Sequence, residues 1–115
     1  MNKRSFAIPV RGVVDDTDSF TLLCPVFPNG TLVCYDRITV VDRDNVPDLV
    51  TVGFRVGAGE YDVESWIPTI ANEVKAAQGR IFVPGSFRVF GRVYGATSGD
   101  VFEVTIYGYV TENVN

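Results

Sequence analysis

The sequence predicts an all-β fold, a single jelly-roll-like β-sandwich of about eight short antiparallel strands. Polar and apolar residues alternate with a period of two, and β-branched and aromatic residues are concentrated in the alternating segments. Clusters of Gly, Pro, Asn and Asp separate these segments at intervals of about 8 to 12 residues. Because 115 residues suffice for one core and not for two, we expect one domain over residues 1–115.

The expected strands follow the alternation in chain order. Residues 67–78 are ambiguous, because Ile70, Val74 and Ala77 fall at helical spacing whereas Ile67-Pro68 favours a break. We expect irregular chain there, and then a strand from about Glu73. Residues 1–6 either begin the first strand or form an extended N-terminal arm. The clearer strands are expected at residues 6–14, 21–27, 31–41, 49–56, 60–66, 80–83, 87–94 and 101–110.

Two turn sequences predict hairpins. Pro28-Asn29-Gly30 suits a type I turn closed by a left-handed glycine, so residues 21–27 and 31–41 are expected to pair. Gly57-Ala58-Gly59 separates residues 49–56 from residues 60–66, which predicts a second hairpin.

The two cysteines raise the question of a disulfide. Cys24 and Cys34 are symmetric about Asn29, so the first hairpin would place them opposite one another, at a distance that a disulfide can span. The alternative is two reduced thiols in one core, which we favour because the sequence shows no sign of secretion.

The last strand separates its side chains into two sets. Phe102, Val104 and Ile106 alternate with Tyr107 and Tyr109, which predicts one core face and one partly exposed aromatic face. Aromatic residues are enriched in protein interfaces, and the competing interpretation is that they fill the core. The candidate interface residues are Phe6, Phe102, Tyr107 and Tyr109.

No catalytic apparatus is apparent in the sequence. The chain contains no histidine, which removes the usual general base and the commonest neutral metal ligand. It has no Gly-rich phosphate loop before a helix, no nucleophile elbow and no cysteine pair with zinc spacing. We therefore expect no enzyme activity and no cofactor.

Two acidic segments, residues 15–18 and 42–48, have the oxygen ligands that calcium prefers. Neither has the ligand spacing or the bidentate glutamate of a recognised calcium loop. We expect them to be solvated acidic turns rather than metal sites.

Trp66 is a candidate for stacking on a sugar ring, since flat aromatic faces suit pyranoses. A carbohydrate-binding surface needs several such rings together, and this chain has one tryptophan. Packing is the simpler explanation of Trp66.

Charge and hydropathy exclude two classes of partner. The formal net charge is −4 and the ten basic residues are scattered, so we expect no nucleic-acid binding. No apolar run reaches the ~20 residues of a membrane span, and the first residues do not resemble a signal peptide. We expect a soluble protein made in a cytoplasm and no membrane partner.

Four segments form a recognisable series along the chain. The first is Ile38-Thr39-Val40-Val41-Asp42-Arg43-Asp44, a strand end of the pattern "I-T-V-x-[ND]-R-D". The second is Thr51-Val52-Gly53-Phe54-Arg55-Val56-Gly57, and residues 81–85 and 95–109 follow. This series, over roughly residues 38–109, resembles small β-rich virion proteins of tailed bacteriophages, of the capsid cement or decoration type.

The resemblance implies a structural virion subunit, made in the host cytoplasm, that binds the outside of a capsid. It also implies a symmetric homo-oligomer, with a trimer favoured, and the major capsid protein or another virion protein as partner. It provides no catalytic residues. The alternative function is a ligand-binding β-sandwich, either a carbohydrate-binding or a host-attachment module.

Overall fold

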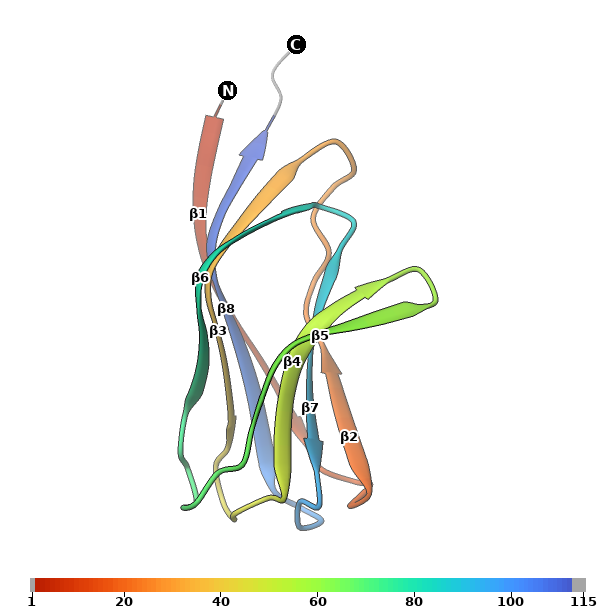
Figure 1. Cartoon of the computed structure of the whole chain (residues 1–115), viewed down its shortest axis with the longest axis vertical. Helices are drawn as coiled ribbons and strands as arrows, with labels where there is room; N and C mark the ends of the chain where they lie inside the picture. Colours follow the sequence, from red (N-terminus) through yellow and green to blue (C-terminus); the bar gives the residue numbers. More distant parts are fainter. Residues whose placement is uncertain (1, 113–115) are drawn as a thin grey trace.

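The computed structural model describes residues 2–112, and the side chains of residues 3–111. Eight strands form two four-stranded antiparallel sheets that pack face to face (Figure 1). The first sheet has the order β1-β8-β3-β6, with bounds Asn2–Val13, Val101–Glu112, Leu32–Asp42 and Lys75–Pro84. The second sheet has the order β2-β7-β4-β5, with bounds Ser19–Leu23, Arg88–Tyr94, Leu49–Val56 and Gly59–Trp66.

The strand order is that of a jelly roll. Consecutive strands change sheet at every connection except β4–β5, which is a hairpin within the second sheet. The first and last strands pair with each other, from Asn2 opposite Glu112 to Val13 opposite Val101. The predicted all-β class and the jelly-roll-like sandwich are therefore confirmed. From Asn2 onward the segment considered as an arm lies in β1, and Met1 lies outside the described residues.

The predicted hairpin around Asn29 is wrong, whereas the β4–β5 hairpin is confirmed. Residues 28–31 do form a turn, in which the Thr31 N–H donates to the Pro28 carbonyl at 3.3 Å. Gly30 has a φ of 85°, which suits the third residue of a type II turn. The turn connects the two sheets, because β2 pairs with β7 while β3 pairs with β6 and β8.

The backbone hydrogen bonds of this connection show why no hairpin forms. The Phe27 N–H donates to the Gly85 carbonyl, and the Gly85 N–H donates to the Thr31 carbonyl, both at 3.0 Å. The β2–β3 connection is thus bonded to the β6–β7 turn rather than to itself. Turn residues specify a change of chain direction, and the available strand partners decide in which sheet each arm lies.

Residues 67–74 form an irregular connection, as expected, and β6 then runs from Lys75 to Pro84. A bulge interrupts β6 where Gly79 has a φ of 119°, opposite the register shift between Tyr35 and Arg37 of β3. The helical spacing in this region has no structural counterpart, because Ile70 and Val74 are 63% and 51% exposed.

Strand β5 is an exposed edge. It pairs with β4 alone, and its residues from Glu60 to Ser65 are all exposed. The acidic side chains Glu60, Asp62 and Glu64 alternate along it. Charged residues on an edge strand discourage pairing with other chains.

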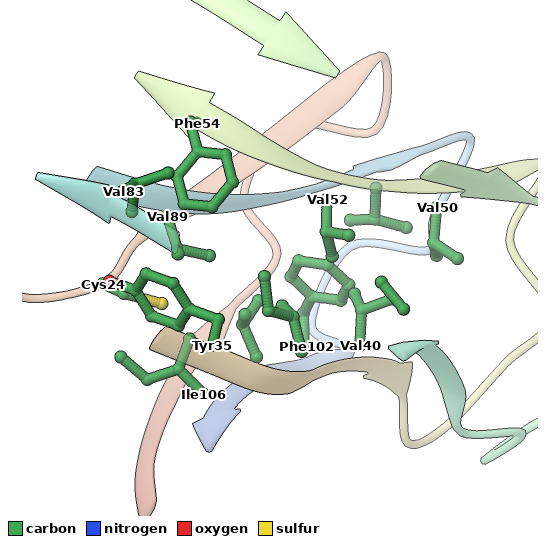
Figure 2. Close-up of a cluster of buried hydrophobic side chains, with 14 of the residues drawn as sticks. Cys24, Tyr35, Val40, Val50, Val52, Phe54, Val83, Val89, Phe102 and Ile106 are labelled. Atoms are coloured by element: carbon green, nitrogen blue, oxygen red, sulfur yellow. The ribbon is translucent and has the colours of Figure 1, made fainter. Parts of the chain in front are cut away.

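The core lies between the sheets, where side chains from β4 and β7 meet side chains from β3 and β8 (Figure 2). Its inward positions on β8 are the ones that the alternation predicts, including Phe102, Val104 and Ile106 at 0% exposure. The largest fully buried side chains of this core are Tyr35, Phe102, Ile38 and Ile106.

Gly108 of β8 has no room for a side chain. A Cβ atom built on it would overlap the carbonyl oxygen of Cys34 on the neighbouring strand β3. We expect Gly108→Ala to lower the free energy of unfolding by about 1–3 kcal/mol, because the two backbones must separate. Gly59→Ala is the control, since its Cβ would meet nothing closer than 3.4 Å. Urea unfolding of both variants checks this, and equal midpoints would contradict it.

Candidate functional site

The outer face of the β2-β7-β4-β5 sheet is covered by its own charged side chains. Phe90 points outward from β7 yet is 0% exposed, and the Arg92 guanidinium lies 4.8 Å from its ring centroid. Glu60 bridges Arg92 and Arg55 at 2.9 and 2.6 Å. Hydrogen bonds from Arg92 and then Arg55 lower the pKa of Glu60 to about 2. On this face the charges of Arg55, Arg92 and Glu60 are therefore paired with one another.

The outer face of the β1-β8-β3-β6 sheet is different. Tyr109 of β8 and Phe82 of β6 both pair with Cys34 of β3, so these three residues form one row across the sheet. Tyr107 lies one row further along β8, opposite Arg37. Phe82 is 53% exposed and both tyrosines are partly exposed. We call the surface made by Phe82, Tyr107, Tyr109, Lys3, Arg37 and Arg80 the tyrosine face.

Cations stand over both tyrosine rings. The Lys3 ammonium is 4.8 Å from the ring centroid of Tyr109, and the Arg37 guanidinium carbon is 4.5 Å from that of Tyr107. Such cation–π contacts hold long side chains over the rings that they cover. Two main effects raise the pKa of Tyr109. The larger is a hydrogen bond with the Cys34 thiol, and the smaller is burial.

The tyrosine face is positively charged although the chain has a net charge of −4. Lys3, Arg37 and Arg80 are exposed on this face. The acid Asp36 is also close enough to Tyr109 to raise its pKa, whereas the charge of Arg80 lowers it. Glu103, further along β8, is bonded by Arg43 at 2.7 Å and also contacts Arg11. Other described acids lie away from this face, among them those in residues 15–18 and along β5.

The four candidate interface residues separate into two groups. Tyr107 and Tyr109 lie on the tyrosine face, as the alternation predicts. Phe6 and Phe102 instead point into the sandwich, where Phe102 belongs to the core and Phe6 packs partly buried against it. The Phe6 ring packs 4.9 Å from that of Phe27, and Phe102 is 0% exposed. Phe82 was missed, although its place between inward-facing Ile81 and Val83 is the signal that could have found it.

Trp66 does not belong to the tyrosine face. It lies at the end of β5 in the other sheet, opposite Val50, and packs half-buried against the core. Only part of its ring is free for a ligand. The described part of the chain has no pocket.

The two thiols lie on opposite faces of β3. Cys24 belongs to the core beside Tyr35 (Figure 2), where burial raises its pKa to about 12. Cys34 points outward, with its sulfur 3.8 Å from an Asp36 carboxylate oxygen. Both are free. The candidate disulfide is therefore wrong, because it required the two strands to pair as a hairpin.

The acidic segments shape turns. Asp16 accepts the Asp18 N–H at 3.0 Å, and Asp42 accepts the Asp44 and Asn45 N–H groups at 3.0 and 3.1 Å. Carboxylates that bond the backbone two or three residues on are typical of such turns. Residues 2–112 contain no group of three or more metal-ligating side chains suited to a metal ion.

We expect alkylation to find two thiols without prior reduction. Both cysteines are buried, at 0% and 1% exposure, so iodoacetamide should react slowly with the folded protein. In denaturant without reductant, mass spectrometry should show two adducts. A bridged pair would give none, and that result would contradict the placement of the thiols.

Within residues 2–112 there is no helix long and apolar enough to cross a membrane. No protein-family model and no curated protein matches the sequence. A solved structure described as "CBM4 structure and function" is similar at 16% identity and a TM-score of 0.39, with 93% of this chain and 84% of that chain covered. The jelly-roll assignment follows from the strand order, and the description of the tyrosine face follows from the contacts given above.

Proposed function

We propose that this chain is a non-catalytic binding domain that attaches to an acidic surface of a partner protein through the tyrosine face. The observation that carries the proposal is the contrast between the two outer sheet faces. One is closed by the Arg55–Glu60–Arg92 bridge, and the other presents aromatic rings and cations with little acidic compensation.

The tyrosine face combines features that favour protein recognition. Tyrosine, phenylalanine and arginine are enriched in interface cores. Strand pairing on both sides of β8 fixes the backbone that carries Tyr107 and Tyr109, so little backbone freedom is lost on binding. The rings also hold Lys3 and Arg37 in place, which lowers the entropy that these long side chains lose when they meet carboxylates.

The same contacts argue against a sugar ligand at this face. A pyranose stacks on an open aromatic face, whereas Lys3 and Arg37 already cover one face of each tyrosine ring. Trp66, the other candidate for stacking, is half-buried in the opposite sheet. The carbohydrate-binding alternative therefore has less support from the geometry than protein docking.

The resemblance to phage virion proteins offers one identity for the partner. A capsid presents many identical copies of one surface, so each contact between subunit and shell need only be modest. This role and the trimer rest on the resemblance described above. Sedimentation velocity at micromolar concentration tests the trimer. If only monomer is observed, the trimer is contradicted, whereas the docking proposal is unaffected.

Charge reversal on the tyrosine face should weaken binding to an acidic polypeptide. We expect immobilised poly-L-glutamate to retain the wild-type chain at low salt, and a Lys3→Glu/Arg37→Glu variant to bind at least about tenfold more weakly, which corresponds to about 1.4 kcal/mol. Phe82→Ser should weaken binding less, because it removes contact area without changing charge.

Lys75→Glu is the matched control. Lys75 lies on the same sheet but pairs with Glu73 at 3.2 Å, away from the tyrosine rings. Equal losses in the control and the double variant would contradict the proposal. Preferential binding to duplex DNA, or glycan-array binding that Trp66→Ala abolishes, would replace it with a nucleic-acid or a sugar ligand.

A further inference from the structure

Two buried carboxyl groups meet at the end of the sandwich opposite the termini. Asp42 is the last residue of β3, and Asp100 immediately precedes β8 (Figure 1). Asp42 is 3% exposed and Asp100 is 2% exposed. Both lie where the β3–β4 and β7–β8 connections pack together, far along β8 from the tyrosine face.

Most oxygens of this pair have donors. Oδ1 of Asp42 accepts the N–H groups of Asp44 and Asn45. Oδ1 of Asp100 accepts the Asn45 side-chain amide at 2.6 Å, and Oδ2 accepts the Thr97 N–H at 3.2 Å. Oδ2 of Asp42 is buried and has no donor among the described residues.

The charged groups around the pair are directed elsewhere. Arg43 turns to Glu103 at 2.7 Å and to Asn72 at 2.8 Å, and Arg11 contacts Glu103 as well. Asp44 accepts the Val101 N–H at 2.7 Å, and the Asp48 carboxylate lies against Gly95. None of the ion pairs within residues 3–111 includes Asp42 or Asp100. A cation therefore does not balance the two carboxylates.

A buried carboxylate oxygen without a donor is costly, and two adjacent carboxylates resist being ionised together. A proton on one of them turns two facing acceptors into a donor and an acceptor. We propose that Asp42 and Asp100 hold one shared proton that ties the β3–β4 connection to the β7–β8 connection, and that releasing it loosens this end of the sandwich. The proposal does not depend on the tyrosine face.

The direction of the pH effect follows from the environment of Asp42. Burial, and then the hydrogen bond that a protonated Asp42 gives to Asp100, raise the pKa of Asp42 to about 6, against about 3.9 in an unfolded chain. Between these two values the folded state binds more protons than the unfolded state, so stability falls as the pH rises. The chain has no histidine, the side chain that ordinarily titrates in this range.

Unfolding at pH 5 and pH 7 tests the shared proton. We expect the unfolding equilibrium constant of the wild type to rise about tenfold between the two pH values. Asp42→Asn removes the titrating carboxyl and keeps an oxygen acceptor, so it should abolish the rise, whereas Asp100→Asn removes the neighbouring carboxylate and should reduce the rise. Asp62→Asn, which changes an exposed acid of β5, is the control and should keep it.

Two further measurements keep the proposal testable if a variant fails to fold. Carboxyl-carbon NMR of the wild type should show the Asp42 carboxyl titrating near pH 6. Hydrogen exchange at the Thr97 and Val101 amides should also speed up above that pH. The increase should exceed the one that base catalysis produces in every exposed amide as the pH rises. An Asp42 carboxyl that titrates below pH 4.5, or a pH dependence that Asp42→Asn leaves unchanged, would overturn the proposal.

Discussion

The strict alternation of side chains along β8 is the constraint on which the rest of the structure depends. This strand lies between β1 and β3, so neither of its edges is free. Phe102, Val104 and Ile106 point into the sandwich and complete the core. The same backbone necessarily turns Tyr107 and Tyr109 outward. Core and candidate binding surface are therefore two sides of one strand, and a one-residue shift in its pairing would exchange them.

The two sheets use their outer faces in opposite ways. In the β2-β7-β4-β5 sheet an outward phenylalanine is covered by the protein's own Arg92, and Glu60 neutralises that arginine. In the β1-β8-β3-β6 sheet the cations also stand on aromatic rings, but among residues 3–111 no glutamate bridges Lys3 and Arg37 to one another. An ion pair satisfied within the chain has little left to offer a partner, so the second arrangement is the one suited to recognition.

Much of the fold was predictable from the sequence, because alternation and turn chemistry are local. The β4–β5 hairpin and the inward residues of β8 follow from them directly. The connection around Asn29 could not be predicted in this way, because a turn sequence says nothing about which strand each arm will pair with. Phe6 and Phe102 were assigned to an interface on residue type alone, whereas strand parity places both inside. Asp100 meets Asp42 only through the folded chain, and no local pattern relates residues so far apart in sequence.

The single local hairpin has a consequence for how the chain reaches its structure. Every strand pairing other than β4–β5 joins segments that are distant in sequence, and β1 finds its partner only in β8. Closing such large loops costs chain entropy before the contacts that repay it can form, so jelly rolls fold slowly. Until β8 docks, the backbone edges of β1 and β3 that pair with it have no partner. The acidic edge of β5 then has a second use, because it discourages association of chains while the first sheet is still incomplete.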